Sequence, residues 1–436
     1  MSREKNITAI DLGTDKCVTL IATLSPEDRK PNVVGVSVVP SKGMRKSVIV
    51  DLEKVVATIS ESLDAAERMA GFDVKSAYVS VSGSHVNSRN SKGVVAVAAP
   101  DQEITPMDVE RVIEAARAIS LPNDQEIIHV IPRDFKVDSQ EGIKDPVGMT
   151  GVRLESEAHI VTGSTTSLKN LEKCINDLGL QVDSFVFSGL AAAEVALTET
   201  EKELGVVLVD LGAGSTSICA FVDGSLEYSG SIPIGARHIT QDIALGCRIS
   251  LESAEKIKLA LSEDFYQPVK PHPGESKEDL QKRRKKADEL NLAKLGVQET
   301  VEIMSKRTLV EGIMTPRMKE IIEMVAEKLR DNNLLDKVPA GVVITGGGAE
   351  TARLIETARR ALNLPARIGS ANDLSGLVGD ISKPLFATSV GLVMYGQNVG
   401  GGHTSQKENP FLSALKHIKV GGVFDKITDL FKSILP

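Results

Sequence analysis

The sequence predicts an α/β fold of two similar domains that face each other across a cleft. Two stretches, Asn6–Leu20 and Gly205–Thr216, each contain an apolar, strand-like run that ends at an aspartate and a small-residue turn. They lie about half a chain apart, and repetition of this kind is typical of duplicated units. A third stretch, Val342–Glu350, is a strand-like run that ends in three glycines. The order of these stretches indicates one cleft to which both halves contribute a turn.

The turn in the second half has the chemistry of a phosphate site. The preceding run, Val206–Val209, is wholly aliphatic, as expected for a strand covered on both faces. The glycines of the turn let backbone N–H groups approach an anion, the hydroxyls add donors, and the aspartate is placed to hold a hydrated divalent cation. The candidate nucleotide-binding residues here are Asp210, Gly212, Gly214, Ser215 and Thr216. A tight turn between strands that carries an aspartate by chance has the same local pattern.

The first turn and the triple glycine complete the predicted site. In the first turn the candidates are Asp11, Gly13, Thr14 and Lys16. Asp15 departs from a phosphate-binding pattern because it adds a negative charge, which Lys16 would have to offset. The three glycines are expected to let the backbone approach a flat base or sugar, although a helix N-terminus or a flexible turn is a simpler interpretation. They are Gly346, Gly347 and Gly348.

Composition excludes several classes of protein. A chain of 436 residues with 42% hydrophobic and 25% charged residues can bury two cores and is not disordered. An aromatic content of 3%, the lack of tryptophan and a net charge of −8 argue against a nucleic-acid partner. The N-terminus runs straight into a strand, and no apolar stretch approaches the ~20 residues of a membrane span. We therefore expect neither a signal peptide nor a transmembrane helix.

The cysteines are expected to be reduced thiols of a cytoplasmic protein. They are Cys17, Cys174, Cys219 and Cys247, and no two of them form a CxxC pair. The spacing therefore favours neither a metal site nor a disulfide framework.

The remaining elements follow from periodicity. Helices are predicted over Asp51–Ala70, Thr105–Ser120, Ser250–Leu261 with Ser250 as N-cap, Thr315–Asp331 and Lys383–Gly396. Strands are predicted at Val33–Val39, Ala77–Ser82, Ser217–Val222 and Ser225–Pro233, the last two joined by an Asp223-Gly224 turn. The content of Ser84–Val161 changes and indicates a subdomain inserted into the first half. Ser262–Lys286, with its prolines and the basic run Lys282–Lys286, is expected to be a surface excursion with a solvated charged face.

The two aspartate turns and the triple glycine, in this order, resemble the ATPase superfamily of actin, heat-shock chaperones and sugar kinases. The resemblance implies that the cleft binds ATP with Mg²⁺, and that Asp11 and Asp210 hold the metal through water. Glu255 and Lys258 lie three residues apart on one face of a predicted helix. The superfamily implies that they clasp the nucleotide ribose, and a surface ion pair explains the spacing nearly as well.

Three further stretches carry a more specific resemblance. Ile128–Glu155, Phe187–Ala192 and Leu197–Gly205 are similar to the FtsA family of actin-like bacterial cell-division proteins, and the similarity runs through essentially the whole chain. It implies an actin-like (ribonuclease H-like) two-domain ATPase fold with an inserted subdomain and a C-terminal amphipathic helix. The implied subdomains are 1A (1–83, 163–200 and 370–396), 1C (84–162), 2A (201–245 and 311–369) and 2B (246–310), followed by a linker (397–420) and a membrane-targeting helix (421–436).

The C-terminal stretch has the pattern of a helix that lies in a membrane interface. Its apolar face would carry Val423, Phe424, Ile427, Leu430, Phe431, Ile434 and Leu435. The helix would be roughly 20 Å long, which is too short to cross a bilayer. Residues 411–436 carry four lysines against two aspartates, which suits anionic lipid. A helix docked on its own domain is the alternative, but a glycine-rich linker is a poor way to hold a core helix.

The resemblance to FtsA implies an assembly protein rather than an ordinary enzyme. It would form head-to-tail filaments as a peripheral protein on the cytoplasmic face of the membrane at the division site. The implied partners are anionic lipid, other copies of itself, later division proteins and the C-terminal peptide of the tubulin-like protein FtsZ, bound near Ser250–Val310. Alternatives are a PilM-like pilus-assembly protein and a soluble ATPase or kinase of the same superfamily. The sequence offers no carboxylate base for a sugar kinase, and no peptide-binding domain of a chaperone after about residue 390.

ATP hydrolysis is expected to be slow or undetectable. In the heat-shock chaperones the segment between the halves supplies an acidic residue that positions water. The corresponding segment here, Ser188-Gly189-Leu190-Ala191, has none. Nucleotide binding is therefore better supported than turnover.

Overall fold

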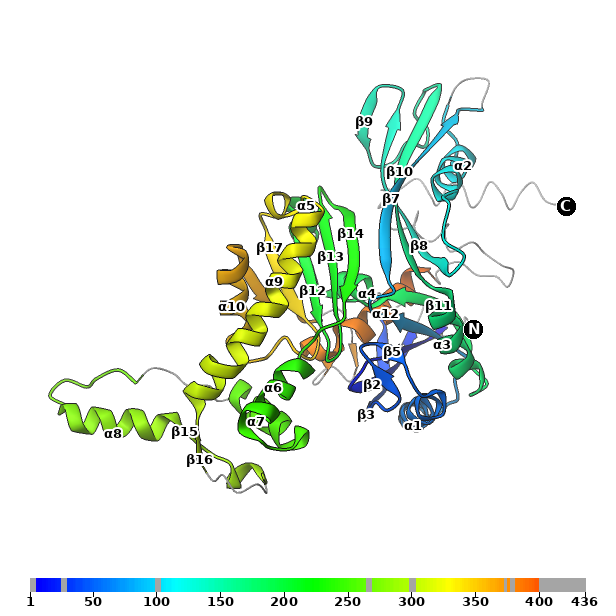
Figure 1. Ribbon diagram of the computed structural model, residues 1–436. Coiled ribbons are helices and arrows are strands. Elements are labelled where there is room, and N and C mark those ends of the chain that lie inside the picture. Colours follow the sequence, from blue (N-terminus) through cyan, green and yellow to red (C-terminus); the bar gives the residue numbers. More distant parts are fainter. Residues whose placement is uncertain are drawn as a thin grey trace.

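A computed structural model shows two α/β halves of the same topology and a small third sheet that projects from the first half (Figure 1). The structure describes residues 5–24, 30–98, 103–263, 269–297, 303–371, 375–376 and 381–399. Both halves contribute to the central cleft, as the duplicated turns predict.

The first half is built on a six-stranded sheet in the order β11-β6-β1-β2-β3-β19. Its strands are β1 (Lys5–Leu12), β2 (Lys16–Leu24), β3 (Asn32–Pro40), β6 (Ser76–Val81), β11 (Gln181–Phe187) and β19 (Ser375–Gly376). β1, β2 and β3 form an antiparallel meander, and β6 runs parallel to β1 on its other side. Residues 7–10 of β1 are all buried, because helices cover both faces of the sheet.

The second half repeats this arrangement in the order β14-β13-β12-β17-β18. Its strands are β12 (Val206–Leu211), β13 (Thr216–Val222), β14 (Ser225–Ile232), β17 (Gly341–Thr345) and β18 (Ala366–Ile368). Asp11 pairs with Val18 in the first hairpin, and Asp210 pairs with Ser217 in the second. The two aspartates therefore occupy equivalent positions, one register step before each turn.

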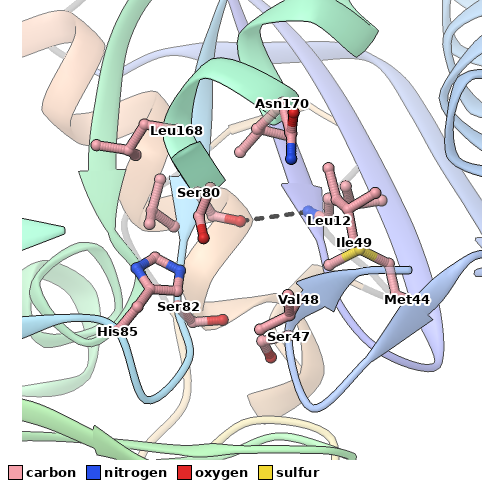
Figure 2. A pocket seen from close by; sticks show the side chains of 13 residues that line it. Leu12, Met44, Ser47, Val48, Ile49, Ser80, Ser82, His85, Leu168 and Asn170 are labelled. Carbon is pink, nitrogen blue, oxygen red and sulfur yellow. Dashed lines mark hydrogen bonds between the residues drawn. The ribbon is translucent and has the colours of Figure 1, made fainter. Parts of the chain in front are cut away.

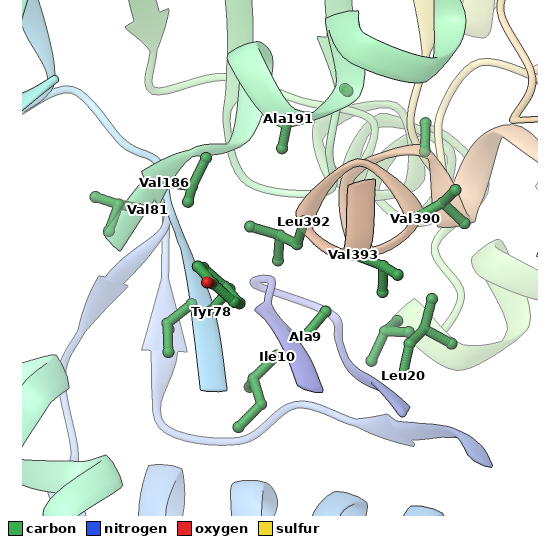
Figure 3. Close-up of a cluster of buried hydrophobic side chains, with 14 of the residues drawn as sticks. Ala9, Ile10, Leu20, Tyr78, Val81, Val186, Ala191, Val390, Leu392 and Val393 are labelled. Carbon is green, nitrogen blue, oxygen red and sulfur yellow. The ribbon is translucent and has the colours of Figure 1, made fainter. Parts of the chain in front are cut away.

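Two helices pack against each other at the centre of the molecule, α4 (Ser188–Ala196) and α12 (Ala387–Val399). A Cβ atom on Gly391 of α12 would lie 1.8 Å from the carbonyl oxygen of Ala191, so only glycine permits this close crossing. Figure 3 shows Leu392 and Val393 of α12 directed toward the first sheet, in a cluster with Ile10 and Tyr78. The last helix thereby closes the core of the first half.

The other face of the first sheet is covered by α1 (Leu52–Ala70), which packs on β2 and β3 and also contacts α3 (Thr165–Asn176). Asp51 caps the N-terminus of α1 by accepting from Lys54 N–H, and Gly71 ends it with a φ of 83°. A short hairpin, β4 (Met44–Arg45) with β5 (Val48–Ile49), precedes α1 and reaches toward the cleft.

The second half has its own helices and its own core. They are α5 (Glu199–Leu204), α6 (Arg237–Cys247), α7 (Leu251–Glu263), α9 (Thr315–Asp331) and α10 (Leu354–Leu362), with short turns η1 (Ala293–Leu295), η3 (Leu335–Lys337) and η4 (Pro384–Phe386). A π-helix, η2 (Thr308–Met314), runs directly into α9, whose buried face carries Ile321, Ile322, Val325 and Leu329. These residues form the core of the second half together with β12 and β13.

The inserted subdomain is a four-stranded sheet in the order β7-β10-β8-β9 with one helix on it. Its elements are β7 (Asn87–Ala96), α2 (Pro106–Arg117), β8 (Gln125–Val137), β9 (Gln140–Ile143) and β10 (Arg153–Ser164). A Cβ atom on Gly93 would lie 2.0 Å from the carbonyl oxygen of Val112, so glycine lets α2 pack directly on β7. A small core forms between them, with Val109, Ile113, Phe135 and Leu154 fully or almost fully buried.

The insertion also contacts the second half, because β7 lies beside β14, as Figure 1 shows. The hydroxyl of Ser88 donates to the Ser229 carbonyl at 2.6 Å, and the imidazole of His159 lies 2.6 Å from both Asn90 Oδ1 and Ser229 Oγ. His159 is fully buried. The insertion therefore bridges the two halves at the outer edge of the second sheet.

Most predicted elements are confirmed, including the fold class with its inserted subdomain. Asp223 and Gly224 have φ of 52° and 77°, which is the positive-φ pair that a tight hairpin turn requires. None of the described residues of Ser262–Lys286 is buried, as predicted for a surface excursion, and the basic run belongs to a helix, α8 (Lys277–Asp288), which the sequence did not indicate. This helix is followed by the hairpin β15 (Glu289–Asn291) and β16 (Ile303–Ser305). The predicted membrane helix, 421–436, lies outside the described residues. In the part of the chain that the structure describes, no helix is long and apolar enough to cross a membrane.

Candidate functional site

A cleft of about 960 Å³, open to solvent, lies where the two hairpins meet. It is lined by both turns, by the triple glycine, and by residues from α6, α7 and the start of α12. With one exception, the nucleotide-binding residues predicted from the sequence line this cleft: Asp11, Gly13, Thr14, Lys16, Asp210, Gly212, Gly214, Ser215, Glu255, Lys258, Gly346, Gly347 and Gly348. The cleft therefore unites segments that are hundreds of residues apart in the chain.

The two turns have the same backbone geometry. Gly13 N–H donates to the Lys16 carbonyl at 2.9 Å, and Gly212 N–H donates to the Ser215 carbonyl at 3.1 Å. A Cβ atom on either glycine would lie 2.9 Å from the accepting carbonyl oxygen, so both positions favour glycine. Each turn thus presents its backbone to the cleft.

The exception is Thr216. Its side chain is fully buried, and its hydroxyl donates to the Ile234 carbonyl at 2.7 Å. This hydroxyl is already used inside the second sheet. The prediction that the Thr216 hydroxyl faces a phosphate was therefore wrong, whereas its neighbour Ser215 does line the cleft.

Two half-buried carboxylates lie at the floor of the cleft. Burial raises the pKa of Asp11 to about 6, although a 2.6 Å hydrogen bond from the Ser80 hydroxyl lowers it. Burial, reinforced by the negative charge of Asp11, raises the pKa of Asp210 to about 7, against weaker hydrogen bonds from Thr388 and Ser188. Two desolvated carboxylates that repel each other are stabilised by a cation placed between them. This is the electrostatic environment that a hydrated divalent ion fits.

A metal bound here would need ligands beyond these two side chains. Among the described residues, no group of three or more histidine, cysteine, aspartate or glutamate side chains could hold a metal ion directly. Water and phosphate oxygens would therefore have to complete its coordination. This agrees with the prediction that Asp11 and Asp210 act through water, which stays a prediction.

The triple glycine is explained by close approach to the second aspartate. Gly346 has a φ of 86°, and a Cβ atom there would lie 2.4 Å from Asp210 Oδ1 and 2.7 Å from the Leu211 carbonyl oxygen. At Gly348 a Cβ atom would lie 2.7 Å from the Leu211 side chain. At least two of the three positions thus need glycine for packing, and all three line the cleft.

Glu255 and Lys258 form a pair on α7, at the side of the cleft. Lys258 Nζ lies 2.8 Å from Glu255 Oε2, and the Thr240 hydroxyl donates to the same oxygen at 2.6 Å. Burial raises the pKa of Glu255, but the charge of Lys258 and these hydrogen bonds outweigh it and lower the pKa overall. The carboxylate therefore stays charged, with acceptor capacity left for a ligand hydroxyl.

The structure adds cleft residues that the sequence did not indicate. They are Ser47, Ser82, Ser217, Arg237, Leu259, Leu385 and Thr388, together with Val18, Ala213 and Ala236. Arg237 and Asp15 approach to 4.0 Å, and each belongs to a different half. Ser47 comes from the β4–β5 hairpin, where the positive φ of Lys46 and Ser47 is not encoded by a glycine. No local motif marks these positions.

A second pocket, of about 460 Å³, adjoins the cleft and shares Ser47 and Ser82 with it (Figure 2). In Figure 2 the Leu12 N–H donates to the Ser80 hydroxyl at 3.2 Å, which orients Ser80 toward Asp11. His85 lines this pocket, and its Nδ1 accepts from the Ser164 N–H at 3.3 Å. Burial lowers the pKa of His85, so it is neutral and holds the start of α3.

The cysteines are free, as predicted: Cys17, Cys174 and Cys219 are buried, and Cys247 is half-buried.

Comparison with protein families gives two matches along the chain. A model described as the SHS2 domain inserted in FtsA matches residues 83–162, and a model described as cell division protein FtsA matches residues 207–391. The first match covers the inserted sheet, and the second covers most of the second half and the start of α12.

Comparison with curated proteins gives long matches. A cell division protein FtsA of Pseudomonas aeruginosa is 37% identical over 403 residues, which cover 90% of this chain and 89% of that protein. The protein of the same name from Borreliella burgdorferi is 37% identical over 413 residues, covering 95% and 94%. That of Bacillus subtilis is 36% identical over 395 residues, covering 91% and 84%.

Comparison with solved structures concerns the fold. The PilM–PilN type IV pilus biogenesis complex superposes with a TM-score of 0.57 at 14% identity, covering 89% of this chain and 98% of that chain. MreB 5 of Spiroplasma citri bound to AMPPNP superposes with a TM-score of 0.52 at 13% identity, covering 91% and 97%. These neighbours confirm the predicted actin-like fold.

Proposed function

Because this chain belongs to the FtsA family of cell division proteins, we propose that it is an ATP-binding, actin-like protein that assembles on the membrane at the division site. The observation that carries the proposal is the convergence of both aspartate turns and the triple glycine on one cleft. Pilus assembly and sugar phosphorylation, the alternatives from the sequence, have no comparable support in the family matches.

The nucleotide would bind with its phosphates between the two turns. The backbone N–H group of Gly214 and the hydroxyls of Thr14 and Ser215 suit an anionic chain of oxygens, while the N–H groups of Gly13 and Gly212 hold the shape of the turns. A chain with AMPPNP bound is among the fold neighbours, which supports the same use of this cleft. The ribose would be held by Glu255 and Lys258, whose carboxylate and ammonium are already fixed by Thr240.

Mg²⁺ would enter with the nucleotide, held through water by Asp11 and Asp210. The raised pKa of each carboxylate, about 6 and about 7, makes the pair unfavourable when both are charged and no cation is present. Asp11 and Asp210 would position the hydrated ion beside the phosphates, and the ion would supply charge neutralisation for the two carboxylates and the phosphates.

ATP hydrolysis would be slow because the cleft offers no acidic residue in the segment between the halves. Ser188 lines the cleft at the start of α4, and its hydroxyl lies 2.9 Å from the Ser217 hydroxyl. A serine is a much weaker base than a carboxylate. The nucleotide would therefore act chiefly by holding the two halves together.

Closure of the halves on Mg-ATP would favour head-to-tail filaments. The two halves are joined at the cleft floor by α4 and α12, so a rotation about these helices changes the shape of both ends of the molecule. A filament of identical subunits depends on such end surfaces. Nucleotide and assembly would in this way be coupled.

Attachment to the membrane would use the C-terminal stretch, 421–436. Its apolar face, from Val423 to Leu435, and the four lysines of 411–436 are the supporting sequence features. The attached protein would be peripheral, on the cytoplasmic face of the membrane. FtsZ filaments would be held there through the FtsZ C-terminal peptide, bound near 250–310, and the inserted subdomain would contact later division proteins.

The proposal is tested by co-sedimentation with liposomes of anionic lipid, with and without Mg-ATP. We expect the intact chain to pellet, and a chain that ends at Gly396 to stay in the supernatant. Phe431→Asp in the intact chain should abolish pelleting, because a charge on the apolar face opposes burial in the interface. Equal pelleting of the intact and shortened chains, or pelleting of neither, would move the proposal to a soluble actin-like ATPase.

A further inference from the structure

The helix α8 (Lys277–Asp288) stands apart from the rest of the described chain. It makes no substantial contact with any other described helix or strand, and none of its residues is buried. Figure 1 shows it well away from both large sheets. A polar helix of this length gains little stability on its own, so its stability has to come from local anchors or from a partner.

Local hydrogen bonds anchor both ends of α8 and one of its faces. Ser276 caps the N-terminus by accepting from Asp279 N–H at 3.1 Å. Arg283 pairs with Glu275 at 2.6 Å and so ties the middle of the helix to the preceding loop. Asp288 accepts from the Ser305 hydroxyl at 2.6 Å, which joins the C-terminal end to β16. The face that carries Arg283 is therefore used within the protein.

The face next to that of Arg283 is a row of unpaired cations. Lys282, Lys285 and Lys286 are exposed and lie three and four residues apart, and none has an ion-pair partner among the described residues. The helix carries six basic residues against three acidic ones, and two of the acidic ones, Asp279 and Asp288, are engaged in the anchoring hydrogen bonds. On a chain of net charge −8, this face is a local positive surface.

The composition of this face favours a bilayer over a protein partner. Protein interfaces are depleted of lysine and are built around aromatic or large apolar anchors. The one large apolar residue of α8, Leu280, is half-buried, and α8 contains no aromatic residue. An anionic membrane needs no pocket, and attracts each lysine or arginine near its surface by about 1 kcal/mol.

We propose that the exposed lysine face of α8 is a second membrane contact, which binds the headgroups of anionic lipids and orients the body of the protein. The inference rests on the proposed membrane function, and it assigns to the second half a contact separate from the C-terminal stretch. The linker expected at 397–420 would span roughly 25 Å as a flexible chain, so it tethers the first half without orienting it. A contact through α8 supplies the orientation, and the tether raises its effective concentration at the surface.

The experiment measures binding of the full-length protein with Mg-ATP to vesicles of phosphatidylcholine with and without phosphatidylglycerol. The test variant is K282Q/K285Q/K286Q, which keeps helix propensity and removes three unpaired charges. The matched control, K169Q/K173Q/K328Q, removes three exposed lysines from α3 and α9. The chain that ends at Gly396 measures separately how much the C-terminal stretch contributes to vesicle binding. Circular dichroism and ATP affinity check that each variant is folded.

We expect the α8 variant to bind anionic vesicles about tenfold or more weakly than the control variant, and the difference to vanish in high salt. If both variants bind equally while removal of the tail abolishes binding, the α8 inference is overturned and the proposed function stands. If the wild-type chain itself does not bind anionic vesicles, both fail. Poly-glutamate serves as a model of an acidic polypeptide. If the α8 variant loses binding to poly-glutamate while its binding to vesicles is unchanged, the lipid assignment is overturned in favour of an acidic polypeptide.

Discussion

The hydroxyl oxygens of Ser47 and Ser215 lie 2.7 Å apart, and they join the first half of the molecule to the turn of the second half. Ser47 N–H also donates to Thr14 Oγ1 at 2.9 Å, so one serine contacts both turns. A Cβ atom on Gly214 would lie 2.4 Å from Thr14 Oγ1, which shows how closely the turns approach. A phosphate chain that enters between the turns must replace these contacts with hydrogen bonds of its own.

Ser215→Ala should weaken binding of Mg-ATP about tenfold, because a lost hydrogen bond to a charged oxygen costs about 1.5 kcal/mol. Ser231→Ala is the control, since the Ser231 hydroxyl is buried without a hydrogen-bond partner among the described residues. Titration calorimetry measures both. Equal affinities for the two variants would mean that the Ser215 hydroxyl does not contact phosphate.

Gly346→Ala should unfold the protein at a clearly lower urea concentration and abolish ATP binding. The added Cβ atom would lie 2.4 Å from Asp210 Oδ1, at a φ of 86°. Gly179→Ala is the control that measures backbone strain without a steric clash. Gly179 has a φ of 77°, and a Cβ atom added there would have no neighbouring atom within 4 Å. The control should cost about 1 kcal/mol, from backbone conformation alone. A Gly346 variant no worse than the control would contradict the close approach to Asp210.

Asp210→Asn should stabilise the nucleotide-free protein at pH 8 and weaken Mg-ATP binding. The pKa of Asp210 rises from 3.8 to about 7 on folding, so the folded state holds the proton more tightly than the unfolded state. The contribution of this group to stability is therefore greatest at low pH, and is lost as the pH rises through about 7. Asparagine cannot ionise, so at pH 8 the free energy of unfolding of the variant should exceed that of the wild-type chain by an amount on the order of 1–3 kcal/mol.

Thermal denaturation from pH 5 to 8, with and without Mg-ATP, measures the effect of Asp210→Asn. Mg-ATP should raise the melting temperature of the wild-type chain more than that of the variant, because bound Mg²⁺ would offset the charge of the Asp210 carboxylate. If Mg-ATP stabilises both chains equally, Asp210 does not take part in metal binding.

The buried imidazole of His159 should lower the free energy of unfolding in mild acid. Burial, with added repulsion from the charge of Arg133, lowers the pKa of His159 to about 3. The neutral form is then favoured by folding, so the stabilisation is complete above pH 6.5 and is lost as the pH falls below that value. The slope is about 1.4 kcal/mol per pH unit.

Because burial also lowers the pKa of His129, to about 4, the variant His159→Gln should reduce but not abolish the pH dependence of stability between 6.5 and 5. It should also loosen the insertion from β14, because the hydrogen bond to Ser229 depends on this side chain. Hydrogen exchange of β7 and β14 would detect this. Unchanged protection at both strands would argue against a bridging role for His159.

Steady-state ATP hydrolysis should stay below about 1 s⁻¹, the lower end of ordinary enzymes. The physical reason is that Ser188 and Ser217, rather than a carboxylate, occupy the cleft where α4 begins. Phosphate release in the presence and absence of lipid measures the rate. A faster rate would place this chain among ordinary ATPases.

Local patterns predicted the site wherever one short segment carries the chemistry. Asp11, Asp210 and Gly346 stand at the ends of strands whose aliphatic runs are visible in the sequence, and Glu255 and Lys258 follow helical spacing. Ser47, Arg237 and Thr388 come from segments that no motif connects to the turns, so only the tertiary structure places them in the cleft. Thr216 was wrongly assigned because the hydroxyl of a residue at the start of a strand can point to either side, and here it bonds to Ile234.

The helix α8 was missed for a different reason. The prolines before it and its continuous charge hide the usual apolar stripe, because the helix has no core to face. Ser276 and Asp279, its capping pair, were the available signal. The two facing domains were predictable from the repeated hairpins, whereas the actin-like fold with its inserted subdomain was predicted from the resemblance to the FtsA family.

Assignment of the cleft to a nucleotide is tested by calorimetric titration of ATP into the intact protein, with Mg²⁺ and with a chelator. We expect one saturable site that requires Mg²⁺ and is lost in Asp11→Asn/Asp210→Asn, while the variant stays folded. Binding that is indifferent to Mg²⁺ and to both substitutions, or no binding by the wild-type chain, would contradict the assignment of this cleft to a nucleotide.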